Sequence, residues 1–323
     1  MIKKTLCIIF ILVAGAGYSQ QDSQFTQYMY NTVNINPAYA GSRQSMSVFA
    51  LHRTQWVGLE GAPVTNTFSI NAPNGPLNDC NVCPHETTAL SAMGFGLSVI
   101  NDKIGPSDES NIALDFSYTI NTSETYKLSF GLKASANFLN IDFDKLNKYD
   151  KNDYSFDANI DNKFSPNIGA GFYLHSEDTY LGLSVPNFLE TKHFDRYAGT
   201  ISSSHVAKEN INLYLIAGHV FEVSSDVKFK PSVLTKYVQG APLQVDLSGS
   251  FLINEKFAAG AAYRWSAAAS AMIGFQASSS WFIGYSYDLD ATRLSNYNSG
   301  SHEIFLRYEL FDQYGRTMSL RFF

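Results

Sequence analysis

Cysteine, long apolar runs and catalytic motifs are scarce or missing in this chain. Only three cysteines occur, and Cys7 lies inside an N-terminal apolar run. This position excludes a lipoprotein signal, which needs a cysteine at the cleavage point. After the N-terminus no stretch reaches the 18 or so apolar residues of a membrane-spanning helix. Membrane insertion would therefore require a β-barrel, because only helices and closed barrels satisfy the backbone polar groups in lipid.

Enzymatic signatures are also absent. The sequence contains no G-x-S-x-G, no H-E-x-x-H and no glycine-rich phosphate loop, and its seven histidines are scattered singly. A hydrolase site at a barrel rim would need a serine or aspartate beside one of them, and no spacing singles out such a trio. The sequence therefore predicts a protein that is not an enzyme and has no cofactor.

The N-terminus has the pattern of a cleaved secretory signal, for which we expect residues 1–19. Lys3 and Lys4 precede an apolar run over residues 6–13, and Gly17-Tyr18-Ser19 gives a small-x-small cleavage pattern. Cleavage would remove two of the 23 basic residues and none of the 29 acidic ones, so the net charge would fall from −6 to about −8. An exported acidic chain is a poor partner for nucleic acid.

Two remaining cysteines, Cys80 and Cys83, form a C-x-x-C in the polar stretch 72–89. In an oxidising compartment we expect a local disulfide between them. A zinc site would need two further ligands, and His85 supplies only one. The stretch 157–162 approaches a calcium loop, yet Asn162 replaces its turn glycine, so we expect no metal site.

Strict alternation of apolar and polar residues dominates the rest. Ile112, Leu114 and Phe116 lie on one face of a predicted strand, whereas Ala113 and Asp115 lie on the other. A soluble β-sandwich would alternate in the same way, with its apolar face inward. The large number of strands favours an all-β, transmembrane outer-membrane β-barrel of about 14 antiparallel strands, as do the aromatic residues near strand ends. We expect strands near residues 46–55, 64–71, 90–100, 110–120, 125–138, 166–175, 179–185, 210–221, 226–237, 242–252, 256–265, 268–277, 281–288 and 302–310.

The spacing of the strands predicts which connections share one end of the barrel. Short turns such as 121–124 and 222–225 alternate with long connections around 140–163, 186–208 and 289–301. An even strand count would place both termini in the periplasm. The stretch 72–89 is an exception, because it is long where a short turn is expected.

A polar and aromatic segment precedes the first predicted strand, and several elements together resemble one family. QFTQYMYN and NPAYAG (residues 24–41), HRTQWVGLEGAPVTNTFSINAP (52–73), FSPNIGAGFYL (164–174), YLGLSVPNFL (180–189) and SYDLDATRLSNYNSGSHEIFLRY (286–308) resemble the PorP/SprF family of type IX secretion in Bacteroidota. The motif positions that carry the resemblance include Arg53, Gln55, Trp56, His302 and Glu303. The cysteine pair and the acidic 140–163 loop are not defining parts of that family.

The resemblance implies a non-enzymatic outer-membrane component that binds or presents secreted surface proteins, such as the adhesins of gliding motility. It implies partners in the periplasmic secretion ring, the translocon and a secreted cargo protein, in addition to outer-membrane lipid. It supplies no catalytic residues. The alternative is a porin-like or lipid-transporting barrel, since luminal glycines such as Gly94, Gly96, Gly131 and Gly171 would permit an open channel unless a segment fills it.

The segment at residues 20–44 has too little apolar area for a core of its own and too many aromatic residues for a free tail. We expect it to pack on or near a barrel formed by residues 45–310, or to bind a partner. The residues expected to make these contacts are Phe25, Tyr28, Tyr30, Asn36, Pro37 and Tyr39. Residues 311–323 alternate like a strand, which would make the count odd, so we expect a periplasmic tail or closing segment there.

Overall fold

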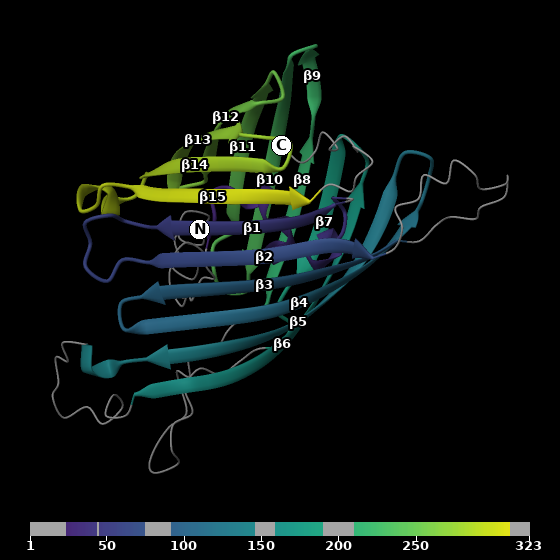
Figure 1. Ribbon diagram of the computed structural model, residues 1–323. Coiled ribbons are helices and arrows are strands. Elements are labelled where there is room, and N and C mark those ends of the chain that lie inside the picture. Colours follow the sequence, from purple (N-terminus) through teal and green to yellow (C-terminus); the bar gives the residue numbers. More distant parts are fainter. Residues whose placement is uncertain (1–23, 44, 75–91, 146–158, 190–209, 311–323) are drawn as a thin grey trace, which may run out of the picture.

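A computed structural model describes residues 24–43, 45–74, 92–145, 159–189 and 210–310. These residues form one antiparallel sheet that curves around an interior space (Figure 1). Its strands are β1 (Met46–Thr54), β2 (Val64–Asn74), β3 (Ala92–Ile104), β4 (Ser107–Asn121), β5 (Lys127–Ile141), β6 (Ile160–His175), β7 (Thr179–Val185), β8 (Asn212–His219), β9 (Phe221–Ser224), β10 (Val227–Val238), β11 (Gln244–Ile253), β12 (Phe257–Arg264), β13 (Ala268–Gln276), β14 (Trp281–Asp290) and β15 (Ser301–Leu310).

The sheet closes on itself. β15 pairs with β1, and each further strand pairs with its neighbour in sequence as far as β8, while β10 pairs with β11. β8 and β9 are successive parts of one strand of the barrel wall (each such wall strand is called a stave below), because β10 pairs with both of them and only Val220 separates them. The wall therefore has fourteen staves, which confirms the predicted β-barrel of about 14 antiparallel strands.

The apolar side chains cover the outside of this wall. Leu114 and Leu132 are 61% and 62% exposed, whereas Asp115 and Ser117 on the opposite face are 3% and 0% exposed. A soluble sandwich would bury the apolar face, so the sandwich alternative is wrong. A barrel with an apolar exterior and a polar interior matches lipid outside and a hydrated or protein-filled lumen inside. In the described part of the chain, no helix has the length and apolar character needed to cross a membrane.

The two ends of the barrel differ. One end, here the turn end, carries the beginning of β1, the end of β15 and short turns such as residues 122–126 and 176–178. The other, here the loop end, carries the connections 55–63, 142–159, 186–211 and 291–300.

Four strands extend further at the loop end than the alternation predicts. β3 and β4 continue to a two-residue turn at Gly105 and Pro106, and β6 begins at Ile160 instead of near residue 166. Gly105 has a φ of 55°, which this tight turn requires. The extensions escape a search for alternation because their outward residues, such as Asn101 and Lys103, are polar.

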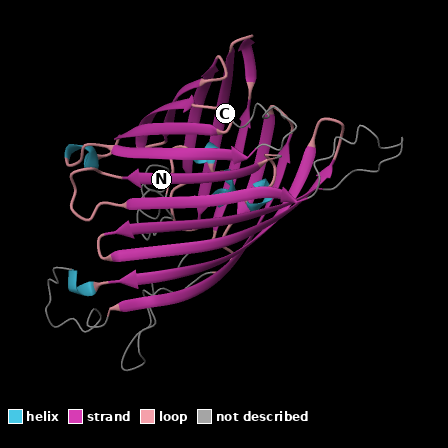
Figure 2. Cartoon of the chain, in the orientation of Figure 1, coloured by secondary structure: helices cyan, strands magenta, loops and turns pink. Residues whose placement is uncertain are grey.

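The hydrophobic core lies inside the barrel. It joins inward side chains such as Phe49, Phe282 and Phe305 to residues of the segment that precedes β1. Figure 2 shows the helical turns of this segment in cyan among the strands. They are η1 (Tyr28–Tyr30), α2 (Thr32–Ile35) and η2 (Pro37–Tyr39). Residues 24–43 are called the luminal segment below.

Several predicted features lie outside the described residues. They are the signal peptide at residues 1–19, the pair Cys80 and Cys83, most of the 140–163 loop and the tail at 311–323.

Candidate functional site

The luminal segment is a chain of three short turns held by its own capping contacts. The Asn36 side-chain oxygen accepts a hydrogen bond from the Ala38 N–H at 3.0 Å, and Pro37 occupies the first position of η2. Proline suits that position because its missing N–H would have no partner within the helix. The Asn36 side-chain amide also donates to the Phe172 carbonyl of β6 at 2.9 Å. The asparagine therefore fixes both the turn and its distance from the wall.

Glycines on the inner wall make room for the segment. A Cβ at Gly94 would collide with the Ala40 carbonyl, and one at Gly131 would collide with the backbone of Ala38. Gly171 stands in the same relation to the Asn36 side chain. The luminal glycines that would permit an open channel are thus, in this structure, the positions where the backbone or a side chain of the segment lies closest to the strands.

Side chains of the wall donate hydrogen bonds to the segment's carbonyl oxygens. Ser117 on β4 donates to Ala40 at 2.6 Å, and Ser184 on β7 donates to Ile35 at 2.8 Å. The Lys133 ammonium on β5 donates to the Asn34 carbonyl at 3.1 Å. Charge-assisted bonds at the end of α2 compensate carbonyls that the short helix leaves unpaired.

Aromatic packing holds the middle of the segment. The ring centroid of Tyr30 lies 4.7 Å from that of Phe305 and 5.4 Å from that of Phe282. The Arg307 guanidinium and the Lys230 ammonium lie 5.6 and 5.5 Å from the Tyr30 ring centroid. Burial raises the pKa of Tyr30 to about 12, against the lowering effect of nearby Arg307 and Arg43, so its hydroxyl is neutral. A neutral ring in this position offers a face to the Arg307 guanidinium and to the Lys230 side-chain nitrogen.

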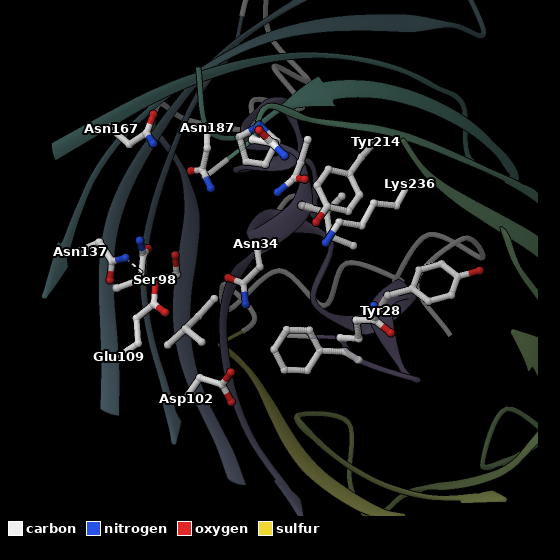
Figure 3. Close-up of a pocket in the computed structure, with 18 of the residues that line it drawn as sticks. Tyr28, Asn34, Ser98, Asp102, Glu109, Asn137, Asn167, Asn187, Tyr214 and Lys236 are labelled. Carbon is white, nitrogen blue, oxygen red and sulfur yellow. Dashed lines mark hydrogen bonds between the residues drawn. The ribbon is translucent and has the colours of Figure 1, made fainter. Parts of the chain in front are cut away.

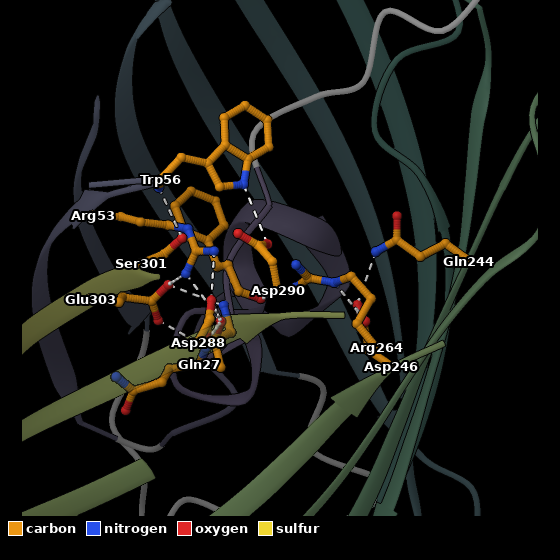
Figure 4. Close-up of polar contacts among 12 residues, drawn as sticks. Gln27, Arg53, Trp56, Gln244, Asp246, Arg264, Asp288, Asp290, Ser301 and Glu303 are labelled. Atoms are coloured by element: carbon orange, nitrogen blue, oxygen red, sulfur yellow. Dashed lines mark hydrogen bonds and ion pairs between the residues drawn. The ribbon is translucent and has the colours of Figure 1, made fainter. Parts of the chain in front are cut away.

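A buried ion-pair cluster holds the start of the segment (Figure 4). Arg53 on β1 pairs with Asp288 on β14 at 2.7 Å and with Glu303 on β15 at 2.9 Å. The two Glu303 oxygens accept hydrogen bonds from the backbone N–H groups of Thr26 at 3.0 Å and Gln27 at 2.9 Å. This single carboxylate therefore joins the wall to the segment through two charge-assisted hydrogen bonds, while its ion pair with Arg53 stays within the wall.

Thr26 completes the cluster. Its hydroxyl donates to the Asp288 carboxylate at 2.6 Å and accepts from the Arg53 guanidinium at 3.0 Å. A second pair, Arg43 with Glu309, fixes the end of the segment where it enters β1, and Arg307 lies 3.1 Å from the same carboxylate. Buried carboxylates of the wall thus secure both ends of the luminal segment.

The structure brings together most of the positions selected from the sequence. Phe25, Tyr28, Tyr30, Asn36, Pro37 and Tyr39 all lie in the lumen. Tyr28 is within 3.3 Å of the Ser248 hydroxyl, and Tyr39 accepts from Arg43 at 2.9 Å. The Phe25 carbonyl accepts from Arg264 at 3.5 Å.

The motif positions divide into two groups. Arg53 and Glu303 face each other directly across the β1–β15 pair. Gln55 and Trp56 lie in the β1–β2 connection, where Trp56 donates from its indole nitrogen to Asp290 at 3.3 Å. His302 instead points outward and contacts the Tyr285 hydroxyl at 2.7 Å.

Three contributors escape sequence reasoning: Asp288, Thr26 and the Arg43–Glu309 pair. For Asp288 and Glu309 the only signal in the sequence is a charged residue on the polar face of a predicted strand. That signal does not identify the basic residue with which each carboxylate pairs. The register of β14, β15 and β1 decides the partners.

A cavity of about 510 Å³ lies between the luminal segment and the loop end of the barrel (Figure 3). Its wall comes mainly from the inner faces of β3 to β6, β8, β10 and β11, and one side is formed by Phe25, Tyr28 and Asn34 of the segment. Side-chain amides are its commonest polar groups. Among the described residues, no group of three His, Cys, Asp or Glu side chains could hold a metal ion.

The sequence matches one protein family over most of its length. Residues 17–308 match the family described as type IX secretion system membrane protein PorP/SprF. The chain belongs to the PorP/SprF family. The predicted family is thereby confirmed, and this PorP/SprF protein is a membrane β-barrel of the type IX secretion system.

Several solved structures are similar to this chain at low sequence identity. One is the CymD monoaromatic hydrocarbon channel, with 13% identity and a TM-score of 0.49; the match covers 92% of this chain and 96% of that chain. Another is the Pseudomonas putida toluene transporter TodX, with 9% identity and a TM-score of 0.46; the match covers 86% of this chain and 93% of that chain. The KdgM porin is a further example, with 7% identity and a TM-score of 0.35; the match covers 82% of this chain and 99% of that chain. No curated protein matches the sequence.

Proposed function

We propose that this protein is a non-enzymatic outer-membrane component that binds or presents a secreted surface protein at its loop end. In this proposal the turn end, where β1 begins and β15 ends, faces the periplasm and contacts the secretion ring. Family membership supports the assignment to type IX secretion.

The observation that carries the proposal is the filled lumen. Val33, Asn36 and Ala38 of the luminal segment are at most 1% exposed, and the segment contacts inner faces on opposite sides of the barrel, from β4 and β6 to β14 and β15. A passive channel needs a continuous water path, which this packing opposes. A barrel closed by its own chain is instead suited to hold a partner on its surface.

The porin-like alternative remains as a second candidate, because the cavity at the loop end is polar and could form one half of a path. It requires the luminal segment to leave its position. Porin activity would then depend on release of Thr26 and Gln27 from Glu303 and of Arg43 from Glu309.

Affinity purification from native outer membranes tests the proposal. A tag in the β10–β11 connection (239–243) avoids both termini and the luminal segment. We expect type IX secretion components and a secreted surface protein to co-purify, and an unrelated tagged barrel from the same membranes should retain neither. Recovery of this protein without any secretion component or surface protein would contradict the proposal.

A further inference from the structure

The cavity at the loop end carries no net charge, because its acidic and basic side chains balance. Three lining residues are acidic (Asp102, Glu109 and Asp246) and three are basic (Lys133, Lys236 and Arg264). Most of these groups already have partners in the wall. Arg264 pairs with Asp246 at 2.7 Å, and Asp102 accepts from the Thr65 hydroxyl at 2.6 Å. A ligand would therefore not be selected by its charge.

Three side-chain amides in the same cavity retain unused hydrogen-bonding capacity. Within the described residues, neither polar atom of the Asn34 amide has a partner, and the Asn137 side-chain oxygen has none. The Asn111 side chain makes no hydrogen bond within the described residues. Asn111 on β4 stands directly opposite Asn137 on β5, and both line the cavity with Asn34 of the luminal segment. Figure 3 shows Asn34 and Asn137 among the groups around this space.

A primary amide offers a donor and an acceptor in one plane, as a peptide group does. The luminal positions also repeat at the right interval for an extended chain. Glu109 and Asn111 on β4, and Ser165 and Asn167 on β6, are each two residues apart, or about 6.8 Å along a strand. Groups on one face of an extended polypeptide laid along these strands repeat at the same interval.

The two tyrosines of the cavity do not favour a sugar ligand, and the remaining aromatic ring, that of Phe25, is half-buried. Stacking against a sugar ring needs an open aromatic face, yet Tyr28 and Tyr214 are only 2% and 9% exposed. The Lys236 ammonium already lies 5.5 Å from the Tyr214 ring centroid. The amide-rich lining therefore favours an uncharged polypeptide.

We propose that the loop-end cavity binds an extended, uncharged stretch of polypeptide, held by hydrogen bonds to the side-chain amides of Asn34, Asn111 and Asn137. This inference rests on the proposed function, since it names the part of a secreted protein that the barrel would hold. It also assigns a position to that contact, on the side of the luminal segment that faces the loop end.

A selection with random uncharged peptides of about twelve residues, using the purified full-length barrel in lipid nanodiscs, tests the site. We expect an enriched pool whose affinity falls roughly tenfold in an Asn111→Leu/Asn137→Leu variant. Loss of two net hydrogen bonds is worth about the 1.4 kcal/mol to which that factor corresponds. Asn121→Leu is the matched control, because Asn121 is an exposed asparagine at the turn end of the same strand. Gel mobility before and after heating verifies that each variant is a folded barrel.

Three results would overturn the inference: no enrichment over empty nanodiscs, equal affinity of the pool for wild type and the double variant, or binding of maltoheptaose in preference to the peptides. The outcome is separable from that of the proposed function. If the double variant loses peptide binding but still co-purifies a surface protein, the cavity exists as a peptide site and the cargo is held elsewhere. If peptides fail to bind while wild type co-purifies a surface protein, only the cavity assignment is wrong.

Discussion

Removal of the Glu303 charge should loosen the luminal segment without opening the barrel wall. Glu303 accepts from the backbone N–H groups of Thr26 and Gln27 and pairs with Arg53. A Glu303→Gln side chain keeps one acceptor oxygen and places an NH₂ group against donors. Arg53 would retain its ion pair with Asp288, so the strands should remain paired.

The magnitude follows from the contacts that are lost. One hydrogen bond to a charged acceptor is worth about 1.5–3 kcal/mol, and the two contacts that remain become weaker neutral ones. We therefore expect docking of the segment to weaken by about 3 kcal/mol, near the lower end of the range for breaking a buried ion pair. This corresponds to a rise of roughly a hundredfold in the fraction of molecules with the segment released.

Labelling of a buried cysteine measures that fraction. Val33 is 1% exposed, so a Val33→Cys thiol should react with a maleimide only when the segment leaves the lumen. The background carries Cys80→Ser and Cys83→Ser to remove other thiols. Glu255→Gln is the control, because Glu255 pairs with Lys228 at the surface. Equal labelling rates in the Glu303→Gln and Glu255→Gln proteins would refute the anchoring role of Glu303.

Three further changes have defined outcomes. Gly131→Ala should destabilise the folded barrel by about 1–3 kcal/mol through overpacking, and so lower the temperature at which the folded gel mobility is lost. Gly249→Ala should change that temperature little, because only a phenylalanine ring lies near Gly249. Leu114→Arg on the lipid-facing side should cost about 2–4 kcal/mol of stability if it lies near the bilayer midplane, measured by denaturant unfolding in vesicles. A cysteine at Thr292 should react with an impermeant reagent on intact cells while one at Ser123 should not, and the reverse pattern would show that the loop end faces the periplasm.

The barrel could be predicted from the sequence because lipid imposes a strict rule on its strands. Every outward residue within the bilayer must be apolar, so period-two alternation marks each stave, as at Ile112, Leu114 and Phe116. The same rule explains why the loop-end extensions of β3 to β6 were not predicted. Where β3 to β6 continue at the loop end, outward residues such as Asn101 and Asp108 are polar and the alternation no longer marks the strand.

The sequence identified many residues of the site, but it did not show which of them contact one another. Arg53 and Glu303 are 250 residues apart, and only the register of β1 and β15 places them opposite each other. The contact of Thr26 with Asp288 depends on where the luminal segment lies, which no periodic pattern encodes. Glycines at positions such as 131 and 171 carried a usable signal, since they suggest close backbone approach, yet they fit an empty lumen equally well from sequence alone.

Conductance in a planar lipid bilayer tests most directly whether the chain closes its own lumen. The wild-type barrel should insert without a steady ion current, because the segment contacts inner faces on opposite sides of the barrel. A barrel lacking residues 24–41 should give a steady current and still show the folded gel mobility. A steady wild-type current equal to that of the shortened barrel would contradict the closed lumen and favour a porin-like channel.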